Sequence, residues 1–227
     1  MTQLDSSKNI QTIDDFKKRS DVHLARKIWH MSGVTFFFLI WSFFPVWLSL
    51  VLLLVAWIIF VPVDLVRLYN PKINRILLRW FKPIMRKSEI DRPAGTTYLI
   101  TGVITVGFLS HPQIVGLSLL FLAFADPIAS YVGIRYGKDK IFGHKSVQGF
   151  VAAFVVCFLL TAGFLYYHNV GEYILIVSLL SGLVGALAEL IPIAKIDDNF
   201  TMPVLSCIGL TFVFSFFNIF QYLVYLK

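Results

Sequence analysis

Asp126 is an acidic residue inside an apolar segment. From residue 116 to residue 127 the sequence is apolar except for Ser118 and Asp126. A carboxylate at membrane depth costs at least ~2.5 kcal/mol on insertion scales, so such a residue usually faces a polar cavity or a cation and is retained for function. Ser130 follows at i+4 and Gly133 at i+7, which puts them on one face of a continuing helix with the acid.

Glycines and cations alternate in the polar stretch that follows. Glycines let the backbone approach an anion closely, and cations neutralise it, so the stretch suits a phosphate cradle. It is not a Walker loop, because only three residues separate Gly133 from Gly137 and Asp139 stands where Ser or Thr would bind magnesium. The alternative is a flexible, positively charged loop. The residues concerned are Gly133, Arg135, Gly137, Lys138, Lys140, Gly143, Lys145 and Gly149.

Glu189 is a second acid within an apolar segment, because residues 174 to 191 are otherwise apolar, small or Ser. Its alternative role is a structural hydrogen bond to another helix. Asp198 and Asn199 follow in a polar stretch that equally fits a simple turn, since Asp and Asn favour turns. Near the N-terminus, Lys27 and His30 share a helical face at i, i+3. An interfacial His is otherwise a headgroup or helix contact.

Four motifs occur in order along most of the chain. They read Arg26-Lys27-x-x-His30-x-x-Gly33; Arg92-Pro93-x-Gly95-Thr96-Thr97-Tyr98; Asp126-Pro127-x-Ala129-Ser130-x-x-Gly133 continuing through Gly137-Lys138-x-Lys140-x-x-Gly143-x-Lys145-Ser146-x-x-Gly149; and Glu189 with Asp198-Asn199-x-x-x-Pro203. Together they resemble the signature of the dolichol kinase, phytol kinase and yeast-type diacylglycerol kinase family. Members of this family are polytopic membrane enzymes that phosphorylate a lipid alcohol, typically with CTP as donor.

The resemblance implies a site for phosphoryl transfer, which needs bound donor phosphates, a divalent metal and an acceptor for the proton of the attacking hydroxyl. Mg²⁺ takes hard oxygen ligands, often one or two carboxylates plus substrate phosphates. The predicted metal ligands are Asp126, Asp198 and Asn199, and the predicted catalytic residues are Asp126, Asp198, Glu189 and His30. The predicted nucleotide-binding residues are Arg26, Lys27, Ser130, Gly133, Gly137, Lys138, Lys140, Gly143, Lys145 and Ser146. Arg92, Gly95, Thr96 and Thr97 are predicted to line the lipid cavity. Which acid acts as the base stays open.

The composition indicates a single membrane domain. The 227 residues are 57% hydrophobic and 15% charged. Cys157 and Cys207 lie in apolar segments and match no metal or redox spacing, so we interpret them as packing residues. The net charge of +7 does not predict a nucleic-acid partner here, because the basic residues lie in loops between apolar spans, where they report orientation. The oligomeric state stays open.

Seven apolar segments predict an all-α, polytopic transmembrane bundle. Their ranges are 28–44, 46–66, 95–109, 113–133, 147–167, 173–191 and 202–226. All but Lys227 of the 20 Lys and Arg residues then fall on one side, which predicts a cytoplasmic N-terminus. Residues 1–25 are interpreted as a cytoplasmic tail that ends in a short helix over 16–24, and residues 26–227 as one membrane-embedded catalytic domain.

Residues 67–92 are basic and amphipathic, which predicts a segment in the headgroup layer with its cations toward lipid phosphates. The alternative is a gate that admits the lipid alcohol. At the end of the second span, Asp64 and Arg67 are interpreted as an interfacial ion pair.

The predicted function is a Mg²⁺-dependent lipid-alcohol kinase that uses CTP, or alternatively ATP, at the cytoplasmic face. Its acceptor is a polyprenol, a phytol-like alcohol or diacylglycerol, and its membrane is a bacterial cytoplasmic membrane or the endoplasmic reticulum. One rival is a phosphatidate cytidylyltransferase, although the Ser-rich, Asp-paired C-terminal signature of that family is missing. Another is a small lipid or ion transporter with Asp126 and Glu189 as a relay. Against it, the glycines and lysines cluster in a loop rather than at a midplane break.

Overall fold

A computed structural model describes residues 24–193 and 196–223 of the chain. Residues 1–23 of the predicted cytoplasmic tail, Lys195 and the last residues of the seventh predicted span lie outside the described residues. The regular secondary structure of the described part is helical apart from one small hairpin, which confirms the predicted all-α fold class.

The α-helices of the described chain are α2 (Leu24–Phe43), α3 (Val46–Tyr69), α4 (Pro71–Phe81), α5 (Gly95–Leu109), α6 (Pro112–Leu120), α7 (Asp126–Arg135), α8 (Val147–Tyr167), α9 (Ile174–Leu190) and α10 (Asp198–Phe216). The helices follow the predicted apolar segments within a few residues, except α4, which lies in the predicted amphipathic stretch 67–92, and α10, which is shifted toward the N-terminus. A π-helical turn, Phe121–Ala125, joins α6 to α7, and short 3₁₀ turns cover Lys87–Glu89 and Ile219–Tyr222. The antiparallel hairpin of β1 (Lys140–Phe142) and β2 (Lys145–Ser146) is an addition to the prediction of a loop.

Four helical segments of the described chain are long and apolar enough to cross a bilayer: Val46–Tyr69, Pro112–Arg135, Val147–Tyr167 and Asp198–Phe216. The apolar helices α5 and α9 are shorter. The count of seven spans and the cytoplasmic N-terminus therefore stay predictions.

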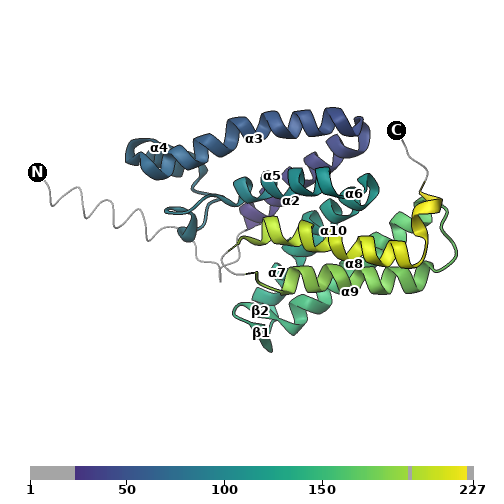
Figure 1. Ribbon diagram of the computed structural model, residues 1–227. Coiled ribbons are helices and arrows are strands. Elements are labelled where there is room, and N and C mark those ends of the chain that lie inside the picture. The colour runs from purple at the N-terminus through teal and green to yellow at the C-terminus, as the bar shows by residue number, and fades with distance from the viewer. Residues whose placement is uncertain (1–23, 194–195, 224–227) are drawn as a thin grey trace, which may run out of the picture.

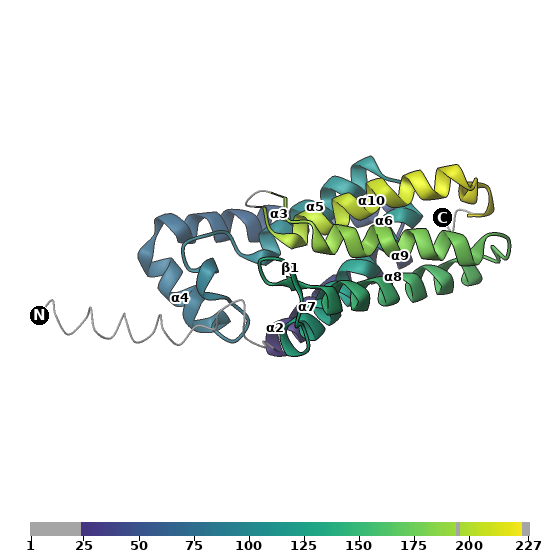
Figure 2. The ribbon, with the colours of Figure 1, turned by 90° about the horizontal axis from the view of Figure 1, so that it is seen from below.

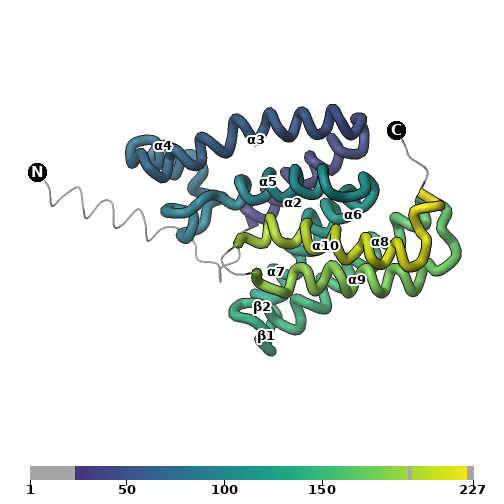
Figure 3. Tube along the Cα trace, in the orientation of Figure 1, coloured from purple at the N-terminus to yellow at the C-terminus, as the bar shows by residue number. Residues whose placement is uncertain are grey.

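The continuous segment α6–α7 lies at the centre of the bundle. In its most apolar stretch of 18 residues, 67% of the residues are buried, compared with 17% in the corresponding stretch of α3. Helices α8 and α9 pack along each other, α10 lies against α9 and α5, and α3 covers the outer side of α5 (Figures 1 and 3). The exposed surface of α3 carries large apolar side chains such as Ile58 and Phe60. Such a face fits contact with lipid rather than with water.

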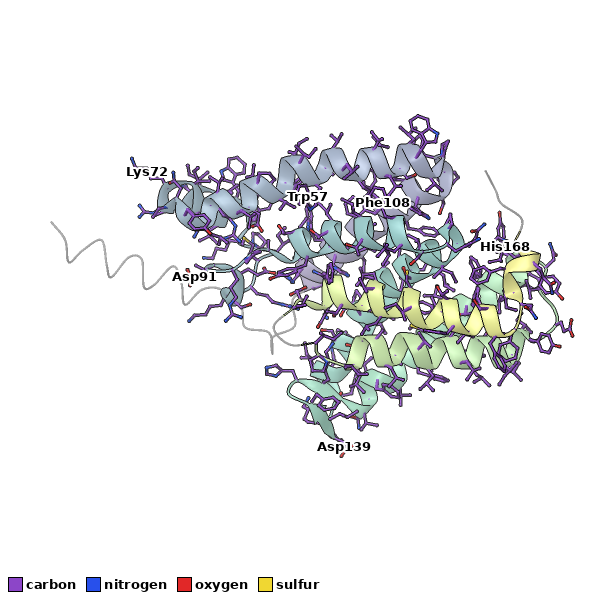
Figure 4. The ribbon with its side chains drawn as sticks, viewed as in Figure 1. Trp57, Lys72, Asp91, Phe108, Asp139 and His168 are labelled. Atoms are coloured by element: carbon purple, nitrogen blue, oxygen red, sulfur yellow. The ribbon has the colours of Figure 1, made fainter. Side chains whose placement is uncertain are left out.

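The polar segments of the chain gather at one end of the bundle, which we call the motif end. It holds the starts of α2, α5 and α10, the end of α9, and α7 with the hairpin (Figures 1 and 2). Asp91 and Asp139 lie at this end, whereas His168 lies at the opposite end with the α8–α9 turn (Figure 4). All four sequence motifs therefore face the same side of the molecule.

Helix α10 begins and ends earlier than the sequence predicts. Its start is fixed by a cap, because Asp197 Oδ1 accepts a hydrogen bond from the Asn199 backbone N–H at 3.1 Å. Asn218 follows its end in the left-handed region with φ 52°, which a continuing helix does not allow. The early start brings Asp198 and Asn199 onto the first turn of the helix instead of a free loop.

Candidate active site

Two adjoining hollows open at the motif end, with volumes of about 550 and 480 Å³ including their open mouths. They share a wall that includes Asp126, Ser130, Arg86 and Asp198. The first hollow is otherwise lined by Arg26, Lys27, His30, Pro127, Ile134, Asp197 and Asn199. The second is otherwise lined by Ala129, Gly133, Ile134, His144, Lys145, Ser146, Gly149, Phe150 and Glu189. Residues of three of the four motifs, from α2, α7, the hairpin, α9 and α10, thus meet around one space.

Asp126 stands directly after the π-helical turn, at the first position of α7. Pro127 has no backbone N–H and its ring disturbs the preceding turn, which accounts for the local widening of the helix. Within that turn, the Leu122 carbonyl oxygen lies 3.1 Å from His30 Nε2, and because a carbonyl can only accept, Nε2 carries hydrogen. The same nitrogen is 3.8 Å from Asp126 Oδ2. His30 and Asp126 therefore form one polar pair at the hollow.

Lys145 lies among acidic groups from three helices. Its Nζ is 2.6 Å from Glu189 Oε1 and 3.3 Å from Asp198 Oδ2, and it donates to the Glu189 carbonyl at 2.8 Å. Burial alone would lower the pKa of the Lys145 ammonium, but the neighbouring carboxylates, first of all Glu189, outweigh it and raise the pKa. Lys145 is therefore a cation at neutral pH. We call Lys145, Glu189, Asp198 and Asp126 the Lys145 cluster.

Lys27 crosses from α2 to α7. Its Nζ donates to Ser130 Oγ at 2.8 Å and to the Pro127 carbonyl at 3.2 Å. Asp126 adds a favourable charge interaction with this ammonium. The i, i+4 spacing of Asp126 and Ser130 thus puts both side chains beside the same lysine.

Gly133, Ser146 and Gly149 bring α7 close to the start of α8. Ser146 caps α8, because its Oγ accepts from the Gly149 backbone N–H at 3.2 Å. A Cβ on Gly149 would lie 2.9 Å from the Ala129 carbonyl oxygen, and one on Gly133 would lie 3.1 Å from Ser146 Oγ. These residues line the second hollow and at the same time make close helix packing possible.

The other predicted nucleotide-binding residues of this stretch, Gly137, Lys138, Lys140 and Gly143, lie on or next to the hairpin and line neither hollow. Lys138 and Lys140 are exposed, and Lys140 Nζ donates to the Gly133 carbonyl at 3.3 Å. Gly143 occupies the hairpin turn with φ +52°, and Gly137 packs against Ser146. A role of these four residues in nucleotide binding stays a prediction.

The residues predicted for the lipid cavity lie beside the first hollow and do not line it. Arg92 and Thr96 are exposed, and the Thr97 hydroxyl donates to Asp64 Oδ2 at 2.6 Å. The Asp64 carboxylate also accepts from Arg67 Nε at 2.7 Å, which confirms the predicted ion pair.

The guanidinium of Arg67 also holds the chain that leads into α5. It donates to the backbone carbonyls of Glu89, Ile90 and Arg92 at 2.7 to 3.3 Å. The Ala94 backbone N–H donates to Asp64 Oδ2 at 2.8 Å. We call Asp64, Arg67 and Thr97 with these backbone partners the Asp64 clamp.

Four further polar residues at the motif end were not among the predicted site residues. Arg86 lines both hollows, Asp197 lines the first and His144 the second. Glu89 is buried and accepts hydrogen bonds from both terminal nitrogens of Arg26 at 2.7 Å. Arg86 and Glu89 belong to the stretch interpreted as interfacial, where sequence periodicity does not separate a lipid-facing cation from one that turns inward. A buried acid such as Glu89 has no sequence signal of its own.

The site offers hard oxygen donors for a divalent cation. Across the described parts of the chain, no group of three or more His, Cys, Asp and Glu side chains is close enough to hold a metal alone. Asp126 and Asp198 nevertheless share the wall of both hollows, and Mg²⁺ is usually held by one or two carboxylates with substrate phosphates completing its shell. Asn199 is less free, because its Nδ2 donates to the Gly95 carbonyl at 3.0 Å. The donor set therefore fits a metal that arrives with a phosphate ligand.

A helical membrane domain with acids and cations around two open hollows is thus the class that fold and site define. Among characterised proteins, the chain is similar to CTP-dependent diacylglycerol kinase 1 of Saccharomyces cerevisiae, with 33% identity over 73% of this chain and 64% of that protein. It is 30% identical to the Schizosaccharomyces pombe protein of the same name, over 63% of this chain and 71% of that protein. A probable chloroplastic phytol kinase 1 of Glycine max is 36% identical over 38% of this chain and 32% of that protein.

The chain belongs to the family of these CTP-dependent diacylglycerol kinases. It spans less than two thirds of the length of the Saccharomyces cerevisiae relative. No protein-family model matches the chain, and no solved structure matches it significantly.

Proposed function

We propose that this protein is a CTP-dependent lipid kinase that transfers the γ-phosphoryl group of the nucleotide to the hydroxyl of a lipid alcohol. The observation that carries the proposal is the shared wall of the two hollows, where Asp126 and Asp198 stand between cations on both sides. The names of the relatives support CTP as donor and diacylglycerol or a phytol-like alcohol as acceptor. The N-terminus and the motif end are proposed to face the cytoplasm, where CTP is available.

The cations have the arrangement that a triphosphate needs. Lys27 and Arg86 line the first hollow and Lys145 lines the second, so both sides of the shared wall offer positive charge. Positioning and electrostatic stabilisation supply most of the catalysis in phosphoryl transfer, because little covalent chemistry is left to the protein. These side chains are proposed to hold the β- and γ-phosphates against that wall.

In the proposed reaction the lipid hydroxyl oxygen forms a bond to the γ-phosphorus while the bond from that phosphorus to the β–γ bridging oxygen breaks, and CDP leaves. The hydroxyl proton goes to a carboxylate of the site. His30 Nε2 is engaged as a donor to Leu122, so it does not accept this proton. Asp126 and Asp198, at the shared wall, are the proposed proton acceptors and Mg²⁺ ligands. When bound, Mg²⁺ neutralises the charge that develops on the phosphate oxygens.

The test is a transfer assay with purified protein, Mg²⁺ and a panel of diacylglycerol, phytol and a polyprenol. CTP labelled at the γ-phosphate is expected to label one of these lipids, and ATP in its place compares the two donors. CTP labelled at the α-phosphate, given with phosphatidate, tests the cytidylyltransferase alternative. Label that enters lipid only from the α-phosphate contradicts the proposal, as does flux through liposomes without any turnover of nucleotide.

A further inference from the structure

Glu89 lies at the meeting point of three parts of the chain. Each of its two carboxylate oxygens accepts a hydrogen bond from one terminal nitrogen of Arg26 at 2.7 Å. Its Oε1 also accepts from the Gly95 backbone N–H at 3.1 Å, and its Oε2 from the Arg86 backbone N–H at 2.9 Å. One buried carboxylate therefore joins α2, the start of α5 and the loop that carries Arg86.

The side chains of Arg26, Glu89 and Asn199 pack against the backbone of Gly95. A Cβ there would lie 2.6 Å from Asn199 Nδ2, 3.0 Å from Arg26 Nη2 and 3.3 Å from Glu89 Oε1. Asn199 in turn donates to the Gly95 carbonyl at 3.0 Å, which ties the first turn of α10 to the same point. We call Arg26, Glu89, Gly95 and Asn199 the Glu89 knot.

The knot leaves part of the Arg26 guanidinium available. Nη1 uses its two hydrogens on Glu89 and on the Ile84 carbonyl at 2.8 Å, and Nη2 uses one on Glu89. Five donors belong to a guanidinium, so Nε–H and the second Nη2–H make no hydrogen bond within the described parts of the chain. Arg26 lines the first hollow, whereas Glu89 lines neither. The arginine is thus fixed on one edge by Glu89, and its side chain lines the first hollow.

Glu89 is charged under ordinary conditions. Burial by itself would raise the pKa of this carboxyl, but the hydrogen bonds and charge of Arg26 outweigh burial and lower the pKa. A bidentate pair of this kind sets both the position and the plane of the guanidinium. Fixing that plane in advance reduces the freedom that Arg26 would lose when an anion binds.

We infer that Glu89 is a positioning residue that holds Arg26 toward the phosphates of the nucleotide, an inference that rests on the proposed function. The knot aims the guanidinium, and Arg26 contacts the donor. Glu89 acts on the nucleotide only through Arg26, because its own oxygens are occupied by the knot. The acceptor lipid plays no part in this contact.

The first experiment measures KM for CTP and KM for the lipid acceptor separately in the Glu89→Gln variant. Gln keeps the size of the side chain but loses the charge and one acceptor, so KM for CTP is expected to rise about 10- to 100-fold, the range for a lost charged hydrogen bond. KM for the lipid is expected to stay within about twofold. Asp91→Asn removes an exposed acid of the same loop (Figure 4) and is the matched control, with no change expected.

The second experiment combines Glu89→Gln with Arg26→Lys. If Glu89 acts through Arg26, the KM for CTP of the double variant should be no higher than the larger of the two single-variant values, because both changes remove the same contact. Multiplying effects would overturn the inference. It would also be overturned if Arg26→Lys lowered the unfolding temperature and left KM for CTP unchanged, the result for a purely structural clamp. This last comparison requires only that the Arg26→Lys variant folds.

Equilibrium binding of CTP to the purified variants keeps this test separate from the proposed function. A wild-type protein that binds CTP but phosphorylates none of the lipids would contradict the proposed reaction, and the Glu89 comparison would still be readable as CTP affinity. A protein that phosphorylates lipid, with Glu89→Gln leaving CTP affinity unchanged, would overturn only the role of Glu89.

Discussion

The Asp64 clamp and the Lys145 cluster both pair acids with a cation at the motif end, but they satisfy their charges in different ways. The Arg67 side chain is 2% exposed and donates to Asp64, Asn74 and three backbone carbonyls. In the Lys145 cluster, the side chains of Lys145 and Asp198 are 20% and 22% exposed and line an open hollow. The first cluster is closed around its own chain, and the second is open to a ligand. Charged pairs of similar composition thus fit opposite tasks, and four changes test the contrast.

The largest effect is expected for Arg67→Met, which leaves the Asp64 carboxylate and several carbonyls without their partner. Breaking a buried pair by removing one member typically costs about 3 to 5 kcal/mol. Unfolding of the purified protein in detergent, by heat and by denaturant, measures the loss. Arg75→Met, on the exposed side of α4, is the control and should leave stability unchanged. A stable Arg67→Met protein that had lost only its affinity for CTP would show that the clamp belongs to the site.

Asp126→Asn should remove activity while leaving the fold intact. Loss of one electrostatic contact to the reacting phosphate typically lowers kcat by about 100-fold or more, or about 2.7 kcal/mol. The assay is γ-phosphoryl transfer at saturating CTP, with unfolding temperature measured in parallel. Asp139→Asn alters an exposed acid of the hairpin (Figure 4) and serves as the control. An active Asp126→Asn protein would contradict the proposed site.

Thr97→Val separates the clamp from the predicted lipid cavity. The Thr97 hydroxyl donates to Asp64, and losing this bond to a charged group is expected to lower the free energy of unfolding by about 1 to 2 kcal/mol. KM for the lipid acceptor should not change. The neighbouring Thr96→Val, at an exposed position, should change neither quantity. A higher KM for the lipid in Thr97→Val alone would place this residue in acceptor binding after all.

The smallest effect is expected from pH. The pKa of Glu89 is lower in the folded protein than its ordinary value of 4.5, because Arg26 stabilises the carboxylate against the cost of burial. Glu89 therefore contributes stability above pH 4.5, and that contribution is lost as the pH falls through the folded pKa. Unfolding temperatures of the wild type and Glu89→Gln should converge on acidification. Parallel curves for the two proteins over that range would remove Glu89 as the titrating group.

The sequence predicts the helices well because their signal is local. Long apolar segments bounded by Pro, Asn and charged residues define helices wherever they are placed, and the predicted ranges for α5 and α8 match the structure. The hairpin next to α7 is not signalled in this way, because its two short strands lack alternating apolar residues. The early start of α10 depends on a single capping contact of Asp197.

The site likewise has residues that local sequence identifies and contacts that depend on how the helices pack. Asp126 and Glu189 are recognisable in the sequence because an acid in an apolar segment is costly. The four motifs, taken in order, identify the other predicted site residues. Whether Lys145 meets Glu189 and Asp198 depends on how α8, α9 and α10 pack. The inward turn of Arg86 and the knot at Glu89 depend on how one polar loop folds back over α2 and α5.

The sequence by itself determined the helical class, the family signature and the identity of the two acids within apolar segments, because each depends on residue type and near-neighbour spacing. Only the tertiary structure decided which charges are closed within the chain and which line a hollow. That distinction depends on distances between side chains far apart in sequence, such as Arg26 with Glu89 and Lys145 with Asp198, which are set by helix packing.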